Sequence, residues 1–156
     1  MLREPLRDIS YGCFLQFMAS PFPDWYLHTL KYSREKLGID AWIDVPCEIF
    51  VPAARPDVID ENNALRLRCK VVLQGANIPV TARAERILHD RGIVSVPDFV
   101  ANAGGVICAS VEYRGGTQKQ AFETIEEKVR ENTRAVLELA RAHSQMPVEA
   151  ALSLAK

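Results

Sequence analysis

Residues 70–98 read KVVLQGANIPVTARAERILHDRGIVSVPD, and this stretch decides the fold. It opens with a β-branched run at 70–74, which predicts a strand that ends at a glycine. Apolar residues at helical spacing then predict a helix that Thr81 caps and Gly92 ends. A second β-branched run at 93–96 stops before a proline and predicts another strand. Because strand, helix and strand follow one another through short connections, the two strands should lie parallel in one sheet.

The chain on either side of this stretch extends the pattern. Residues 47–51 predict a further strand, and 60–68 predict a short helical stretch. C-terminal to the predicted strands, a buried helix that begins with two glycines is expected at 104–113, a long helix at 118–142 and a last helix from residue 147. We therefore predict an α/β fold: a partial Rossmann-like parallel sheet of three or more strands with C-terminal helices.

The length of 156 residues fits one compact domain. Residues 44–156 carry the alternating strands and helices, so we expect them to form that domain. Residues 1–43 are an unassigned N-terminal segment with one predicted helix at 24–37, which Asp24 can cap and Gly38 can end.

The charge pattern argues against two classes of partner. Nineteen basic and twenty acidic residues give a net charge of −1, without runs of like charge, so neither nucleic acid nor a membrane surface is an expected partner. The most apolar stretch, 11–22, is interrupted by polar residues and a proline and is shorter than the roughly 20 residues of a membrane helix. The first residues lack the pattern of a secretory signal, so the sequence predicts a cytoplasmic location.

Neither the cysteines nor the histidines form a spaced motif. Packed, reduced thiols are the favoured interpretation of the cysteines, with a disulfide pair or a zinc site as the alternatives. The histidines lie among charged residues in helical patterns and are expected on the surface, so no metal site is predicted. The residues are Cys13, Cys47, Cys69 and Cys108, and His28, His89 and His143.

Small residues and asparagines follow the predicted strands where open α/β folds bind their ligands. Ala53 and Ala54 follow the first strand, where small side chains leave room for a flat ligand, although a tight turn explains them nearly as well. Asn77 offers one acceptor and two donors at the end of the next strand, but it is equally a common turn residue. Asn102 stands two residues before Gly104, where a helix start can present free N–H groups to a ligand.

From residue 47 onward the chain resembles the nucleotide-binding domain of the glutamate/leucine/phenylalanine/valine dehydrogenase family. The matching segments are CEIFVPAA (47–54), VVLQGANIPVT (71–81), ILHDRGIVSVPDFVANAGGVI (87–107) and ENTRAVLELA (131–140). The strings PDFVANAGGV and GAN-x-P-x-T together are highly specific. The family catalyses reversible NAD(P)-dependent oxidative deamination of amino acids to 2-oxo acids and ammonia. The resemblance implies that residues 44–156 are the C-terminal half of a dinucleotide-binding domain.

The resemblance also assigns roles to individual residues. It places Ala53 and Ala54 beside the adenosine part of NAD or NADP and Asn102 at the nicotinamide end. Val106 and Ala109 fall at positions that face the amino-acid substrate; glutamate-specific members commonly have a serine at the latter. The predicted cofactor-binding residues are Ala53, Ala54, Gly75, Ala76, Asn77, Asn102 and Gly104.

The sequence departs from the family in two respects. It contains no G-x-G-x-x-G fingerprint, and no segment matches the family's domain with the catalytic lysine and aspartate. No catalytic residue is therefore assigned, and the chain is expected to be inactive alone and to form a homo-oligomer or associate with a missing catalytic domain. The alternative is a non-catalytic nucleotide-binding or assembly domain, a remnant of the family. An unrelated parallel α/β module is a third, weaker hypothesis.

Overall fold

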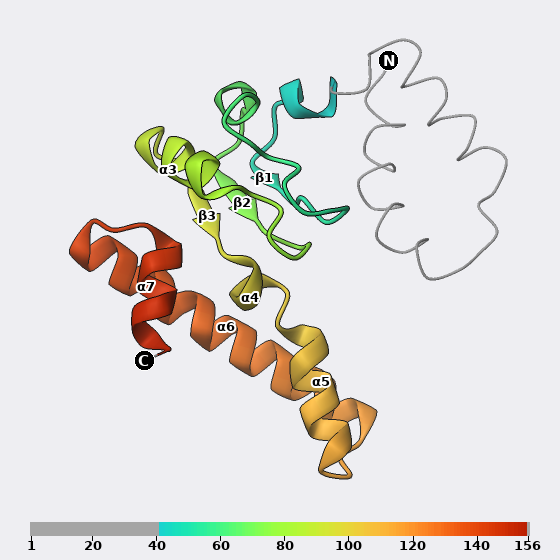
Figure 1. Cartoon of the computed structure of the whole chain (residues 1–156). Helices are drawn as coiled ribbons and strands as arrows, with labels where there is room; N and C mark the ends of the chain where they lie inside the picture. Colours follow the sequence, from blue (N-terminus) through green and yellow to red (C-terminus); the bar gives the residue numbers. More distant parts are fainter. Residues whose placement is uncertain (1–40, 156) are drawn as a thin grey trace, which may run out of the picture. The chain divides into compact units, whose positions relative to one another are not determined.

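The computed structural model describes residues 41–155 and shows strands alternating with helices (Figure 1). The predicted helix at 24–37 lies outside the described residues. The compact unit that holds the sheet begins at Pro46. In chain order, the 3₁₀ helices (η), strands and α-helices are η1 (Ala41–Asp44), β1 (Ile49–Phe50), η2 (Ala64–Arg66), β2 (Val71–Leu73), α3 (Ala82–Asp90), β3 (Val94–Val96), α4 (Asp98–Ala101), α5 (Gly104–Tyr113), α6 (Gln118–His143) and α7 (Pro147–Leu154).

The three strands form one parallel sheet in the order β1-β2-β3, which confirms the predicted fold class. Each strand is shorter than the sequence predicted. Between β1 and β2 the regular ladder starts late, because the carbonyl of Glu48 accepts from both Lys70 N (3.0 Å) and Val71 N (3.1 Å). Ile93 is excluded from β3 because its N–H donates to the carbonyl of Leu88 instead of to the neighbouring strand.

Helices cover both faces of the sheet: α3 lies on one side, and α6 and α7 lie on the other (Figure 1). Successive strand residues point to opposite faces. Ser95 accordingly reaches Glu85 of α3, whereas Val96 packs into the cluster on the α6 and α7 side. That cluster consists of Val96, Val100, Val136, Ala140, Ala150 and Ala151, with Leu73 packed against it.

Helix α3 has the ends that the sequence predicted. The Thr81 hydroxyl accepts a hydrogen bond from Ala84 N (3.2 Å), and Gly92 ends the helix at φ +73°. Beyond the last turn, Arg91 donates from Nη1 to the carbonyl of Ala64 (2.5 Å) and from Nη2 to that of Leu67 (2.7 Å). Arg91 therefore ties η2 to the end of α3.

The helical stretch expected at 60–68 is reduced to the three residues of η2. The side chain of Asp60 accepts from Asn62 N (2.9 Å) and Asn63 N (3.0 Å), and the Asn63 side chain accepts in turn from Asp60 N (3.0 Å). These bonds satisfy the backbone in a turn, so they compete with helix formation.

Helix α5 has its predicted bounds, but the prediction that it is buried is wrong. None of its residues is buried, and Val106 and Tyr113 are 78% and 94% exposed. A helix that is apolar all round needs neighbours on several sides. Within residues 41–155 its principal neighbour is α6, which covers only one side.

The last two helices have well-defined starts. Thr117 caps α6 in a capping box, in which Thr117 N donates to Gln120 Oε1 (2.7 Å). Pro147 occupies the first turn of α7, where Glu149 accepts from Met146 N (3.1 Å). No helix among the described residues is long and apolar enough to cross a membrane.

A polar network lies buried between α3 and the sheet. Gln74 Nε2 donates to Glu85 Oε1 and to Ser95 Oγ (3.0 Å), and the Ser95 hydroxyl donates to Glu85 Oε1 (3.2 Å). All three residues are buried. Burial raises the pKa of the Glu85 carboxyl above its ordinary value of 4.5, with a smaller contribution from the charge of Asp98, although the two hydrogen bonds act in the opposite direction.

Glu85→Gln is expected to raise the melting temperature (Tm) at pH 7 and to leave it nearly unchanged below pH 4.5. Because the folded-state pKa lies above the unfolded value of 4.5, the folded protein binds more protons between these two values. The stability contributed by Glu85 is therefore full below pH 4.5 and is lost as the pH rises through the folded-state pKa. An amide oxygen can accept the same two hydrogen bonds without carrying charge.

Thermal unfolding of Glu85→Gln and its parent from pH 4 to pH 8 tests this expectation. Glu138→Gln is the matched control, because Glu138 is exposed on α6. A lower Tm for Glu85→Gln than for the parent at pH 7 would show that the carboxylate stabilises the network.

Candidate functional site

Three loops meet at the edge of the sheet where the parallel strands end. The first follows β1 and contains Ala53. The second follows β2 and contains Gly75, Ala76 and Asn77, and the third places Asn102 directly after α4. We call these five residues the carboxyl-edge cluster. All five were predicted to bind a cofactor, and the structure brings them together.

Gly75 lets the first two loops touch. A Cβ atom at Gly75 would lie 3.0 Å from Ala53 Cβ and 3.2 Å from Val51 Cγ1, closer than such atoms ordinarily approach. Ala76 N donates to the carbonyl of Pro52 (2.9 Å) at the same place. The absence of a side chain at Gly75 therefore sets the spacing between these loops.

Asn102 joins the third loop to the second. Its Nδ2 donates to the carbonyl of Ala76 (3.3 Å) and to Asn77 Oδ1 (3.1 Å). Among the described residues, Asn102 Oδ1 accepts no hydrogen bond and Asn77 Nδ2 donates none. Asn77 is exposed and Asn102 is half-buried, so an acceptor and two donors remain available to a ligand at this edge.

Asp57 and Asp98 fix the second loop by holding Ile78, and neither residue was predicted from the sequence. Ile78 has a φ of +48°, which is rare for a β-branched residue. Its N–H donates to Asp98 Oδ2 (2.8 Å), and its carbonyl accepts from Asp57 N (2.9 Å). No sequence pattern predicts this conformation, because a residue before a proline, such as Ile78, normally adopts an extended backbone.

Ile78→Gly is expected to stabilise the protein by about 0.5–1 kcal/mol. A left-handed backbone costs a non-glycine residue roughly 1–2 kcal/mol, and the added flexibility of glycine in the unfolded chain offsets part of the gain. Ile78 is 64% exposed, so removing its side chain loses little buried apolar surface. Chemical unfolding measures the change, with Leu152→Gly on α7 as a control that should destabilise. Equal destabilisation by both changes would show that Ile78 is not strained.

The remaining predicted site residues lie apart from these contacts. Ala54 is exposed in the first loop, whereas Gly104, Val106 and Ala109 belong to α5. Val106 and Ala109 are three residues apart, so they share a face of the helix, and both are exposed. No hydrogen bond among the described residues links these four to the carboxyl-edge cluster.

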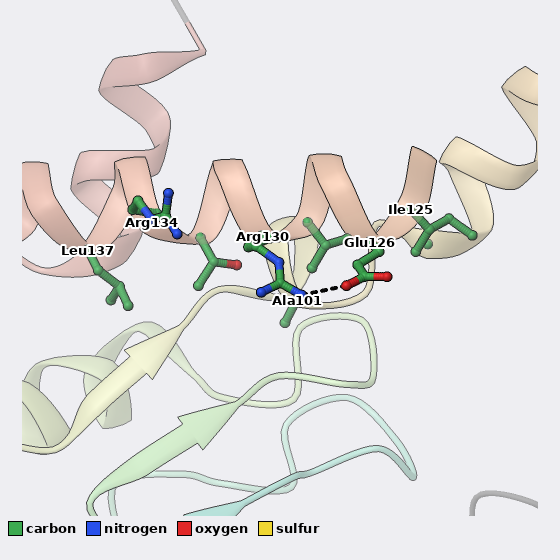
Figure 2. A pocket seen from close by; sticks show the side chains of 9 residues that line it. Ala101, Ile125, Glu126, Arg130, Arg134 and Leu137 are labelled. Atoms are coloured by element: carbon green, nitrogen blue, oxygen red, sulfur yellow. Dashed lines mark hydrogen bonds and ion pairs between the residues drawn. The ribbon is translucent and has the colours of Figure 1, made fainter. Parts of the chain in front are cut away.

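Gly104 lines an open groove of about 600 Å³ along α6 (Figure 2). Its lining mixes apolar residues with the ion pair between Arg130 and Glu126 (2.5 Å). The lining residues are Ala101, Gly104, Ile125, Glu126, Val129, Arg130, Thr133, Arg134 and Leu137. Ala101 and Gly104 flank Asn102 in the chain, so the groove begins beside the carboxyl-edge cluster.

No lysine among the described residues lies in the three loops at this edge. Lys70, Lys119 and Lys128 have largely exposed side chains paired with glutamates away from the cluster, at 2.8, 3.7 and 3.0 Å. Within residues 41–155, no three His, Cys, Asp or Glu side chains are grouped to hold a metal ion. The arrangement can bind and orient a ligand through amides and backbone groups.

Comparisons with known proteins agree on one family. Residues 24–155 match a family described as glutamate/leucine/phenylalanine/valine dehydrogenase. A glutamate dehydrogenase of Aeropyrum pernix is 42% identical over 69% of this chain, which corresponds to 27% of that protein. An NADP-specific glutamate dehydrogenase of Saccharolobus shibatae is 48% identical over 43% of this chain and 16% of its own length. An NAD-specific glutamate dehydrogenase of Staphylococcus aureus is 41% identical over 69% of this chain and 25% of its own length.

A solved structure agrees in fold. The L-tryptophan dehydrogenase of Nostoc punctiforme superimposes with a TM-score of 0.70 at 22% identity, over 81% of this chain and 40% of that one. The chain thus spans about a quarter or less of the length of the curated relatives described above.

Proposed function

Because the chain belongs to the glutamate/leucine/phenylalanine/valine dehydrogenase family, we propose that it is part of an NAD(P)-dependent amino-acid dehydrogenase similar to glutamate dehydrogenase. The reaction is the reversible oxidative deamination of an L-amino acid to a 2-oxo acid and ammonia. The observation that carries the proposal is the carboxyl-edge cluster, in which residues from three loops present amide groups at one edge of a parallel sheet.

In this proposal the carboxyl-edge cluster, together with Ala54 and Gly104, binds NAD or NADP. Ala53 and Ala54 border the adenosine part, where their small side chains admit a flat ring. Asn102 holds the nicotinamide end, since its Oδ1 can accept from a carboxamide while its Nδ2 stays bonded to the second loop. The bound nicotinamide supplies hydride transfer, and fixing its ring brings the reacting carbons into a productive geometry.

The substrate's side chain is proposed to face α5. Val106 and Ala109 are exposed on one face of that helix and are free to contact an amino acid. Ala109 has no hydroxyl, so it cannot donate a hydrogen bond to a distal carboxylate as a serine would. Selection for glutamate would therefore depend on other groups.

Asn102→Ala is expected to weaken binding of NADH and NADPH by roughly 5- to 10-fold, the loss of about one hydrogen bond that orients the ring. Asn132→Ala is the matched control, because Asn132 is exposed on α6. Titration by nucleotide fluorescence measures affinity, and thermal unfolding of the same samples measures stability.

The structural contacts of Asn102 define the opposing outcome. If the Tm falls by several degrees while affinity per folded molecule is unchanged, Asn102 only holds the loop to Ala76 and Asn77. Failure of the parent chain to bind either dinucleotide would contradict a cofactor role for this chain alone and favour an assembly domain that binds no nucleotide.

A further inference from the structure

Two cysteines lie in adjacent segments, each two residues before one of two neighbouring strands. The register pairs Ile49 of β1 with Val71 of β2. Cys47 and Cys69 each lie two residues before these paired positions, and Cys47 N donates to the carbonyl of Arg68 (3.1 Å). This hydrogen bond brings the backbones at Cys47 and Cys69 to about the separation of neighbouring strands.

The spacing of this pair suits a disulfide bond. Neighbouring strands lie about 4.7–4.9 Å apart, within the roughly 4.4–6.8 Å between Cα atoms that disulfides span. Both thiols are free and half-buried. Burial raises the pKa of both Cys47 and Cys69, and the Cys47 thiol itself adds to the shift at Cys69, which requires the two groups to be close.

We propose that Cys47 and Cys69 are a modification site at which a low-molecular-weight disulfide, such as oxidised glutathione, forms an intramolecular disulfide bond. One cysteine thiolate attacks the reagent's S–S bond, which breaks and releases one glutathione as a mixed disulfide forms. The second thiolate attacks the protein sulfur of that mixed disulfide and releases the second glutathione. Both protein thiols are oxidised by two electrons in total, and their two protons end on the two glutathione thiols.

Cys108 is the third cysteine within residues 41–155, and it should not form an intramolecular disulfide bond. It lies on α5 with its thiol directed toward Glu112 Oε1 (3.9 Å), and that helix contains no other cysteine. Its reaction with oxidised glutathione should stop at the mixed disulfide. Cys13 lies outside the described residues and is removed in the test.

The cross-link would fasten the edge strand to the sheet. The β1 strand is paired to β2 at only two residues, its own Ile49 is an exposed apolar residue, and Val51 directly after it is another. A bond from Cys47 to Cys69 closes a loop of the chain, restricts the unfolded state and should raise the Tm. It joins the amino ends of the strands, away from the carboxyl-edge cluster, so nucleotide affinity should be unchanged.

The test uses the full chain carrying Cys13→Ser and Cys108→Ser, treated with oxidised glutathione. The expected product has lost two hydrogens by intact-mass spectrometry, carries no glutathione, shows no free thiol and yields one peptide pair linked through Cys47 and Cys69. Its Tm should exceed that of the reduced sample by several degrees. Unsubstituted chain, analysed by peptide mapping, should show the same link.

Single variants separate pairing from general reactivity. With Cys47→Ser or Cys69→Ser added, the remaining thiol should retain one glutathione and the Tm gain should vanish. The proposal is overturned by two stable glutathione adducts on one chain, by disulfide-linked dimers as the main product, or by absence of reaction under conditions that modify the unfolded chain.

Discussion

The purified chain alone is expected to give no detectable turnover of NAD⁺ or NADP⁺ with any amino acid. Dehydrogenation of an amine needs a group that takes a proton and polarises the substrate. The family resemblance assigns this role to a lysine and an aspartate of a domain that matches nothing here. The lysines of the described part of the chain are exposed and paired with glutamates. Formation of reduced nicotinamide, followed by absorbance, measures turnover.

Reconstitution separates the two functional hypotheses. Adding the lysine-bearing portion of a relative should restore turnover if the chain is part of a dehydrogenase, whereas a non-catalytic remnant would stay inactive in the mixture. Turnover by the chain alone, in a preparation free of contaminating enzyme, would contradict the need for a second domain.

Arg91→Ala is expected to destabilise the protein by about 2–3 kcal/mol, a fall in Tm of roughly 10 °C. The guanidinium donates to the carbonyls of Ala64 and Leu67, two residues that are almost completely buried. Truncation removes two charge-assisted bonds and leaves both acceptors without their partner. Because these two bonds join η2 to the end of α3, against which η2 packs, losing Arg91 should loosen η2.

Arg83→Ala is the matched control, because Arg83 lies on α3, the helix that ends directly before Arg91. Arg83 pairs with Glu61 at 3.4 Å and its side chain is 83% exposed, so its removal should change stability by no more than a few tenths of a kcal/mol. Denaturant unfolding of both variants gives the comparison. Equal effects would show that the Arg91 bonds to η2 contribute nothing specific.

The sequence predicted those features that depend on local patterns. The parallel order of β1, β2 and β3, the Thr81 cap and the start of α6 follow from β-branched runs and capping residues. The meeting of Ala53, Gly75 and Asn102 was also predictable, because it follows from the shared edge of parallel strands.

Features that depend on tertiary contacts were not predictable. The exposure of α5 was missed because an apolar sequence does not reveal which neighbours are present to cover it. The positive φ of Ile78 contradicts local preference and is held by Asp98, twenty positions away. The groove along α6 depends on how that helix packs beside Gly104. Local propensity contains no information about such distant partners.

The two sides of the proposed site are supported by different parts of the fold. The nucleotide side is fixed by loops of the sheet, whereas Val106 and Ala109 are carried on α5, whose principal described neighbour is α6. In the proposed site, substitutions on α5 would therefore change the substrate side while leaving the backbone at Gly75 and Asn102 in place. Under the proposed function, new amino-acid preferences would arise on α5 without a change in coenzyme recognition.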